Sequence, residues 1–445
     1  MSKLFRLTFM FIFCTAFSNM VYCQAYYVIG ERTLRTKKER HSKFHGGLVN
    51  FNYHKENSYM KLESDGTILC FEKVDRKRLS DDKRDHHTIY RTFDVDAGMR
   101  AYRTNGIKSP ARFTRRTLKH PRRVALTHAF TTNAGILSKR YDVYQLLETD
   151  PAYDLQDNAK NVYDELALEI SSAVASGKYT HVVIASTGWN NYPEKAMNTY
   201  NSWIRYIAQA AKADGAEFKP YFIGMTWPSL WQGAAFPFSI FNKANDADEL
   251  GVGNINYLLW KAVMPAAKAG ERKLPVVMIG HSLGARLVSR AAYSRKLLNT
   301  CPSNGNVDVL IALQGAFRIN RFAGKGAGTD GCIYNIDDPV NKFIATTSKY
   351  DGAMSWGFWS TYIGHHKTPQ HIGDVRYRQN FQTVTVNDQG IASSFGDGPY
   401  VIANADKMIW RIPPGGRGLE GAHSDMKDKE AGLFMWSFIK NFAGQ

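Results

Sequence analysis

The sequence predicts an α/β fold: a mostly parallel sheet with helices on both faces, plus an N-terminal β-containing segment. Two observations carry this prediction. From about residue 123, short apolar runs rich in β-branched residues alternate with longer stretches whose apolar residues recur at helical spacing. With 445 residues and 44% hydrophobic content, the chain can also bury a core large enough for such a sheet.

Each predicted element follows from one of these two patterns. The strands are the short runs, at residues 123–130, 181–186, 220–226, 275–279, 307–313, 343–347 and 407–412. The helices are the periodic stretches, at residues 155–174, 196–213, 255–264, 285–298 and 426–442. The first helix, for example, places Leu155, Val162 and Ile170 on one face. Strands and helices alternate, as the crossover connections of a parallel sheet require.

The first 23 residues have the pattern of a secretory signal peptide. Lys3 and Arg6 form a basic start, and an apolar stretch follows over residues 7–17. This stretch is too short to span a bilayer as a helix. Cleavage after Cys23 would leave a mature chain that begins at Gln24. We therefore expect a secreted or periplasmic protein, with an uncleaved interfacial anchor as the alternative interpretation.

Residues 24–122 form the predicted N-terminal segment, and residues 123–445 form the predicted main domain. The N-terminal segment is strongly basic, and the whole chain has a formal charge of +17. Its basic runs at residues 76–78 and 115–116 either contact an anionic surface or are solvated loops. Because no aromatic pattern is interleaved with them, we expect no nucleic-acid partner.

Three cysteines lie beyond the signal peptide. In an oxidising compartment Cys301 and Cys332 could form a disulfide, which would leave Cys70 over and buried. None of the three belongs to a CxxC pair, so the cysteines predict no zinc site.

The segment Gly280-His281-Ser282-Leu283-Gly284 lies between a predicted strand and a predicted helix. In that context G-x-S-x-G forms a sharp turn that presents the serine hydroxyl, and the two glycines let neighbouring backbone pass closely. Ser282 is therefore the candidate nucleophile. The next backbone N–H, that of Leu283, begins the helix and can face a developing oxyanion. His281 is expected to pack beside the serine.

A serine nucleophile needs a base, and the base needs an orienting acid. Asp351 follows the predicted strand at 343–347, so we predict it as the acid. Asp337 and Asp338 precede that strand and would lie at the wrong edge of the sheet. His423 follows the last predicted strand and precedes the final helix, which makes it the predicted base.

Three other histidines, His365, His366 and His371, cluster in one loop and raise the alternative of a metal site. No carboxylate stands at ligand spacing beside them, so we expect no metal. The proposed serine chemistry needs no organic cofactor either.

A second turn can supply the other oxyanion donor. Residues 187–191, with the sequence Thr-Gly-Trp-Asn-Asn, follow the predicted strand at 181–186, where such a turn places an N–H opposite the serine. We therefore predict an oxyanion hole made by the backbone N–H groups of Trp189 and Leu283. The alternative is a plain strand-to-helix turn with Trp189 in the core.

Together these motifs resemble the α/β-hydrolases, specifically a bacterial serine-esterase-like branch of hydrolases of unknown function. That branch carries an HGFNN-like turn, a WPS segment, a GHSxG elbow and a segment like DADELG, which correspond here to residues 188–191, 227–229, 280–284 and 246–251. The resemblance covers residues 123–445. Thr187 replaces the histidine that the branch carries before the glycine, and the long stretch between Asp351 and His423 indicates an insertion.

The resemblance implies acyl transfer to water, that is, ester hydrolysis through an acyl-enzyme on Ser282. The predicted signal peptide, the basic charge and the aromatic flanks add the expectation of a secreted esterase or lipase-like enzyme that acts on a small-molecule or lipid ester. Residues 227–243 are rich in aromatic and small residues and form either a lid or acyl pocket, or an excursion packed on the core. Two alternatives stay open. One is a non-catalytic binding protein on the same fold, and the other is an acyltransferase that excludes water. The sequence carries no prediction of the oligomeric state.

Overall fold

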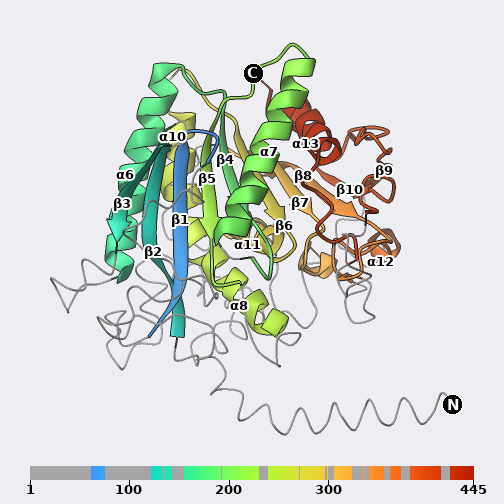
Figure 1. Ribbon diagram of the computed structural model, residues 1–445, viewed down its shortest axis with the longest axis horizontal. Coiled ribbons are helices and arrows are strands. Elements are labelled where there is room, and N and C mark those ends of the chain that lie inside the picture. The colour runs from blue at the N-terminus through green and yellow to red at the C-terminus, as the bar shows by residue number, and fades with distance from the viewer. Residues whose placement is uncertain are drawn as a thin grey trace, which may run out of the picture.

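The structure is a computed structural model, and it describes residues 62–75, 122–133, 136–142, 155–191, 193–229, 239–269, 271–295, 298, 305–322, 334, 340–354, 361–371, 381–411 and 421–444. In this part of the chain ten strands form one sheet, in the order β3-β2-β1-β5-β4-β6-β7-β8-β10-β9 (Figure 1). The strands are β1 Gly66–Asp75, β2 Arg122–Asn133, β3 Ile136–Asp142, β4 His181–Ser186, β5 Pro220–Thr226, β6 Val276–His281, β7 Val307–Leu313, β8 Val340–Thr347, β9 Phe381–Thr385 and β10 Tyr400–Asn404.

The helices of the described residues lie between these strands or after the last one. They are α6 Leu155–Ser176, α7 Pro193–Ala213, α8 Ser239–Val252, α9 Asn254–Tyr257, the π-helix η7 Leu258–Val263, α10 Met264–Lys268, α11 Leu283–Ala292, the 3-10 helix η9 Ile319–Phe322, α12 Thr368–His371 and α13 Lys429–Phe442. The long stretch between Asp351 and His423 contains β9, β10 and α12.

The sheet is parallel from β1 through β5, β4, β6, β7, β8 and β10 to β9. Only the β1–β2 and β2–β3 pairs are antiparallel among the named strand pairs. The predicted fold class, a mostly parallel sheet with helices on both faces, is therefore confirmed. Strand β1 lies within the predicted N-terminal segment, yet it pairs with both β2 and β5, so that segment contributes a strand to the central sheet.

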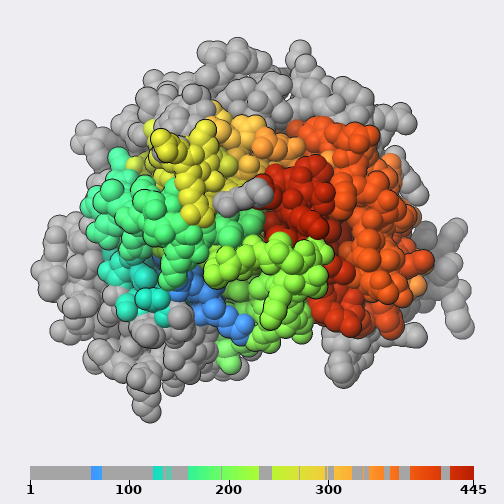
Figure 2. All heavy atoms as spheres, turned by 90° about the horizontal axis from the view of Figure 1, so that it is seen from above, coloured from blue at the N-terminus to red at the C-terminus, as the bar shows by residue number. Residues whose placement is uncertain are grey.

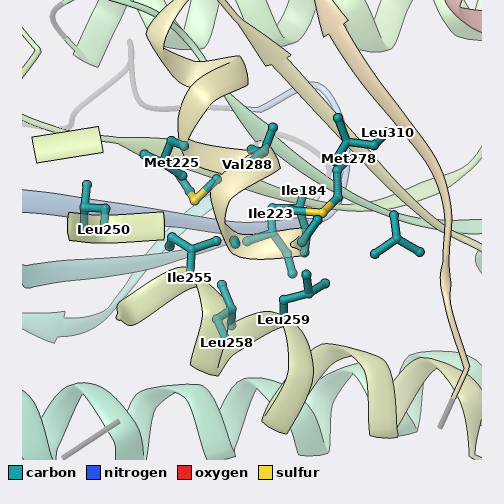
Figure 3. Packing of buried hydrophobic residues seen from close by; sticks show 14 of the residues in the cluster. Ile184, Ile223, Met225, Leu250, Ile255, Leu258, Leu259, Met278, Val288 and Leu310 are labelled. Carbon is teal, nitrogen blue, oxygen red and sulfur yellow. The ribbon is translucent and has the colours of Figure 1, made fainter. Parts of the chain in front are cut away.

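Helices cover both faces of the sheet because successive strand residues point to opposite sides. In β4, Val182 and Ile184 pack with α6, α8, α11 and the α9–η7–α10 run, and Figure 3 shows this core around Met278 and Val288. Val183 and Ala185 pack on the opposite face with α7 and α13. Helices α7 and α13 contact each other on that face, and Figure 2 shows the red C-terminal residues against the green ones of α7.

One predicted strand is wrong. Residues 407–412 were expected to be a strand, but residues 407–411 form a turn followed by an irregular segment, and the N–H groups of Met408 and Ile409 both donate to the carbonyl of Ala405. Both side chains are buried against the core, so burial explains their apolar character without strand pairing. The actual strand is β10, which lies a few residues earlier and pairs with β8 and β9.

Several expectations concern residues outside the described ranges: the signal peptide, the basic runs at 76–78 and 115–116, Cys301, Cys332, and residues 230–238 of the predicted lid. Cys70, by contrast, is described and has a buried free thiol, as expected, and burial raises its pKa. No helix among the described residues is both long and apolar enough to cross a bilayer.

Candidate active site

Ser282 occupies the turn that joins β6 to α11, in a backbone conformation that L-residues rarely adopt. Its φ is 55° and its ψ is −121°, and it is the N-cap residue of α11. The flanking glycines are required by space, because a Cβ at Gly280 would overlap the backbone of Ala285 and one at Gly284 would overlap the carbonyl of Ser186. The strand–turn–helix context predicted for this motif is therefore present, with the strained serine that such a turn imposes.

The turn around Ser282 is held from both sides by backbone hydrogen bonds. The N–H of Ser282 donates to the carbonyl of Leu313 at 3.0 Å, and the carbonyl of Ser282 accepts from the N–H of Ala316 at 3.0 Å. Both partners lie at the carboxyl end of β7. Leu283 is the first residue of α11, so its backbone N–H lies at the positive end of the helix dipole.

The turn after β4 faces Ser282 directly. A Cβ at Gly188 would lie 2.5 Å from the Cβ of Ser282, so only glycine permits this approach. The turn is braced by the WPS segment: the N–H of Asn190 donates to the carbonyl of Ser229 at 3.1 Å, and the indole N–H of Trp227 donates to the carbonyl of Thr187 at 2.9 Å. Trp189 lies in this turn, with its side chain half-buried against the core.

Adding one methyl group at Gly188 tests whether the close contact between this turn and Ser282 matters for the reaction. The Gly188→Ala variant is expected to lower the rate of any Ser282-dependent reaction about 100-fold, because displacing a reactive group by about 1 Å can cost that much. Steady-state kinetics with a chromogenic ester measures the loss. Gly215→Ala is the control: a Cβ there meets nothing within 4 Å, and although the φ of +71° makes alanine unfavourable for stability, the rate of the folded protein should not change. Full activity of Gly188→Ala would show that the turn does not confine Ser282.

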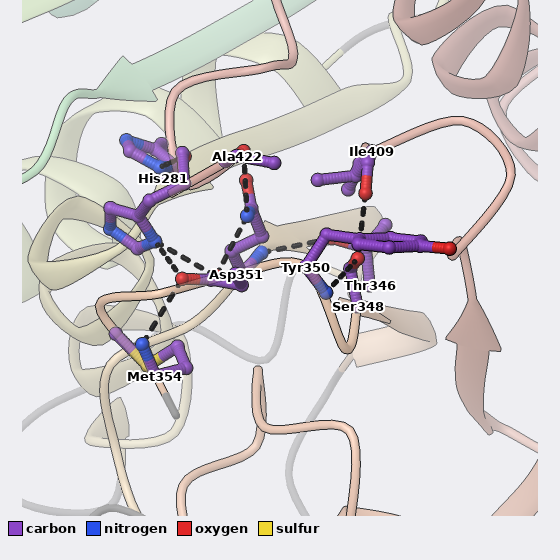
Figure 4. Close-up of polar contacts among 10 residues, drawn as sticks. His281, Thr346, Ser348, Tyr350, Asp351, Met354, Ile409 and Ala422 are labelled. Atoms are coloured by element: carbon purple, nitrogen blue, oxygen red, sulfur yellow. Dashed lines mark hydrogen bonds and ion pairs between the residues drawn. The ribbon is translucent and has the colours of Figure 1, made fainter. Parts of the chain in front are cut away.

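Asp351 and His423 are in contact, although 72 positions separate them in the chain. The Nδ1 atom of His423 lies 2.9 Å from Oδ2 and 3.0 Å from Oδ1 of Asp351. Asp351 is fully buried, and its carboxylate also accepts from the backbone N–H of Met354 at 3.0 Å and from Nε2 of Gln314 at 2.7 Å (Figure 4). A buried carboxylate with this many donors is held in one orientation.

Backbone pairing brings the two loops together. The N–H of Ala422 donates to the carbonyl of Tyr350 at 3.0 Å, and Asp351 forms an isolated antiparallel bridge with Gly421. Gly421 has a φ of +51°, and a Cβ there would lie 2.6 Å from the backbone N of Gly352. The glycine thus lets the loop of His423 lie against the loop of Asp351.

His281 connects this pair to the serine turn. Its ring centroid lies 4.6 Å from that of His423, and its Nε2 lies 2.8 Å from the carbonyl oxygen of His423. Burial lowers the pKa of His281 well below the usual value, and the neighbouring His423 adds to that effect. His281 is therefore neutral near pH 7, with Nε2 protonated because its partner can only accept. The residue just before Ser282 thus fixes the backbone of His423.

The structure brings together most of what the sequence predicted. Ser282, Leu283, His423, Asp351 and the turn containing Trp189 meet at the carboxyl ends of β4, β6, β7 and β8. The rival acids Asp337 and Asp338 lie outside the described residues.

In the described part of the chain, the histidine cluster shows no metal geometry of its own: the ring of His365 stacks on that of His366 with 4.2 Å between centroids. His365 is buried, and its Nδ1 accepts a hydrogen bond from the backbone N–H of Lys367. Within the described ranges, no group of three or more His, Cys, Asp or Glu side chains is arranged to hold a metal ion.

Gln314 is the residue of this site that sequence reasoning missed. It follows β7 directly, and its side chain donates to Asp351. A polar residue at the carboxyl end of a strand, followed by Gly315, was the available signal, because ligand-binding residues gather at that edge of a parallel sheet.

Comparison with known proteins gives weak similarities. No family model matches the chain, and no curated protein matches it. Among solved structures, an uncharacterised protein from Pseudomonas aeruginosa is 12% identical, with a TM-score of 0.27, over 65% of this chain and 50% of that one. The chain thus matches only half the length of that protein.

Two further solved structures are hydrolases by name. A protein from Xanthomonas campestris pv. campestris, provisionally named a hydrolase of the alpha/beta superfamily, is 13% identical over 58% of this chain and 99% of its own, with a TM-score of 0.23. The cutinase of Trichoderma reesei, solved with a phosphonate inhibitor, is 15% identical over 43% and 82%, with a TM-score of 0.18. Similarity at this level assigns no function, so the interpretation rests on the site's own geometry.

Proposed function

We propose that this protein is a serine hydrolase of the α/β-hydrolase type that cleaves carboxylic esters through an acyl-enzyme on Ser282. One observation carries the proposal: the buried Asp351–His423 pair packs against His281, the residue directly before a serine held in a strained turn at a helix N-terminus. Acyl transfer requires a serine nucleophile, a base and an acid that orients the base. In this fold they occur in the chain order serine, acid, histidine, with the serine in a strand-to-helix turn.

In the proposed reaction His423 acts as the general base. Asp351 accepts a hydrogen bond from the N–H group at Nδ1, which leaves the lone pair of Nε2 available for the hydroxyl of Ser282. The reaction therefore requires Nε2 of His423 and Oγ of Ser282 to come within hydrogen-bond distance when substrate is bound.

Each bond change then has an assigned group. Oγ of Ser282 attacks the ester carbonyl while its proton moves to Nε2, and the negative charge on the carbonyl oxygen is held by the N–H groups of Trp189 and Leu283. The carbonyl–alkoxy bond breaks, and the alcohol leaves with the proton from Nε2. Water then attacks the acyl-enzyme with His423 again as base, releasing the acid and restoring Ser282.

The substrate class and location are part of the same proposal. A signal peptide at residues 1–23 would deliver the enzyme to the periplasm or the exterior, and the basic residues of the segment 24–122 would favour an anionic surface. The aromatic residues that follow Trp227 favour an apolar or lipid ester over a peptide.

A fluorophosphonate probe tests the proposed nucleophile. The folded protein should be labelled, and mass spectrometry should locate the label on Ser282. Ser172→Ala, which changes an exposed serine of α6, should be labelled as the wild type is. A series of p-nitrophenyl esters of increasing acyl length then measures activity and the length of the acyl pocket together.

Three results would contradict the proposal in different ways. Absence of labelling would favour a binding protein that has the fold without the chemistry, and labelling at another serine would exclude Ser282. Rapid labelling with ester cleavage only when an acceptor alcohol is present would indicate an acyltransferase.

A further inference from the structure

Gln314 has a backbone conformation that is unfavourable for its residue type. Its φ is 48°, in the left-handed region where glutamine is uncommon, although the next residue is a glycine that would adopt it freely. The surroundings enforce this conformation. The N–H of Gln314 donates to Oγ1 of Thr346 at 2.9 Å, and a Cβ at Gly364 would lie 2.5 Å from the carbonyl carbon of Gln314.

The side chain of Gln314 is fully buried, and both groups near its Nε2 are acceptors. Nε2 donates to Oδ2 of Asp351 at 2.7 Å and lies 3.4 Å from the carbonyl oxygen of Ala422. This chemistry fixes the orientation of the amide, because a flipped amide would set its oxygen against two other oxygens. Oε1 has no hydrogen-bond partner among the described residues, so the side chain's interactions are concentrated on its donor.

A strained backbone and an unpartnered buried oxygen therefore occur at one residue, and each is unfavourable for folding. The strain and the unpaired oxygen both accompany the placement of the Gln314 amide N–H between the carboxylate of Asp351 and the carbonyl of Ala422, in the loop of His423. Such local violations occur preferentially at functional positions, where the surrounding structure supports them.

We propose that Gln314 is a positioning residue for the Asp351–His423 pair, and that its N–H holds the carboxylate of Asp351 in line with Nδ1 of His423. The proposal deepens the proposed function and rests on it for the role of the pair in catalysis. By donating to Oδ2, the amide withdraws negative charge from the carboxylate that faces the imidazole. Without this donor, Asp351 would attract the imidazolium form of His423 more strongly.

The other charges near His423 do not replace this effect. The ring faces Asp351 from the loop after β8 and the neutral His281 from the serine turn. Lys427, four residues beyond His423, and Lys195, in the first turn of α7, both act electrostatically on His281, the ring that packs on His423. Replacing Gln314 leaves all four groups in place, so a change in the titration of His423 would report on the amide.

The test is an NMR titration of the His423 imidazole in the wild type and in Gln314→Met, with the His423 signal assigned by comparison with His423→Gln. Methionine keeps the length of the side chain and removes the donor. The pKa of His423 should rise by about one unit, a tenfold change in proton affinity. The acidic limb of kcat/KM should move to higher pH by the same amount, with KM nearly unchanged.

Gln382→Met is the matched control, because it makes the same chemical change in β9, where Gln382 accepts from the backbone of Asp397. It should leave the titration of His423 as it is. Gln314→Asn is the second variant, since asparagine tolerates the left-handed conformation but is too short to reach Asp351. If methionine prevents folding, this variant decides, and it should show the same rise.

An unchanged pKa of His423 in the folded Gln314 variants would overturn the proposal, whatever happens to the rate. A raised pKa in a protein that hydrolyses no ester would support the positioning role and refute the proposed function instead. The titration and the ester assay thus fail independently of each other.

Discussion

The Ser282→Ala and His423→Ala variants are each expected to lose about 10⁵ to 10⁶ in kcat for ester hydrolysis, and the double variant is expected to lose no more. The reason is that nucleophile and base act as one unit: without the base the hydroxyl is not activated, and without the hydroxyl the base has nothing to activate. Stopped-flow or long-incubation assays with a p-nitrophenyl ester measure these losses against the uncatalysed rate.

Asp351→Asn is expected to lose about 10⁴-fold, because the amide would favour the tautomer of His423 with Nδ1 unprotonated. The matched control is Asp388→Asn, which makes the same change in an exposed turn after β9 and should keep the wild-type rate. If the kcat losses of Ser282→Ala and His423→Ala multiplied in the variant that carries both changes, Ser282 and His423 would act separately. The proposed mechanism would then be wrong.

The parts of this site that could be predicted are those that a local pattern or a topological rule defines. Ser282 lies in a contiguous strand–turn–helix segment, so its surroundings are encoded next to it. Asp351 and His423 are far apart in the chain, but both follow the carboxyl ends of strands, and parallel strands bring these ends to one edge. Asp351 and His423 are in contact at 2.9 Å, although the strand that precedes His423 is β10 and not residues 407–412.

The missed parts depend on contacts between distant segments. Nothing next to Gln314 indicates its positive φ, because Thr346 and Gly364 impose it from other parts of the chain. The apolar residues Met408 and Ile409 resembled a strand because burial in a turn and burial in a strand select the same side chains. Single-sequence patterns report burial more reliably than they report backbone pairing.

Sequence patterns also fail to indicate which charged residues are buried. Asp248 belongs to the DADELG segment, whose composition suggests a solvated helix, yet its carboxylate is buried in α8. It accepts from Nε of Arg286 at 3.0 Å and from both terminal nitrogens of Arg321 at 2.9 Å. Arg286 lies in the first turn of α11, directly after the serine turn, so this cluster connects α8 and η9 to the helix that carries Ser282.

Removing this one carboxylate is expected to destabilise the protein by about 3 to 5 kcal/mol, because Asp248→Ala would leave two buried guanidinium groups without their counter-charge. Burial by itself would raise the pKa of Asp248, but the two arginines lower it well below the usual range. A depressed pKa adds stability that is fully present above the unfolded-state pKa of about 3.9 and is lost as the pH falls below it. Urea denaturation at pH 7 therefore measures the whole effect.

Two comparisons identify the cause. Glu217→Ala breaks the exposed ion pair with Lys219 and should cost about 1 kcal/mol or less, as surface pairs do. The triple variant Asp248→Leu, Arg286→Met, Arg321→Met removes all three charges together and should recover most of the stability that Asp248→Ala loses, because no charge is then left buried alone. If the triple variant were as unstable as Asp248→Ala, lost packing rather than unpaired charge would explain the effect. Recovery of stability without recovery of esterase activity would show that the cluster also orients α11 beneath Ser282.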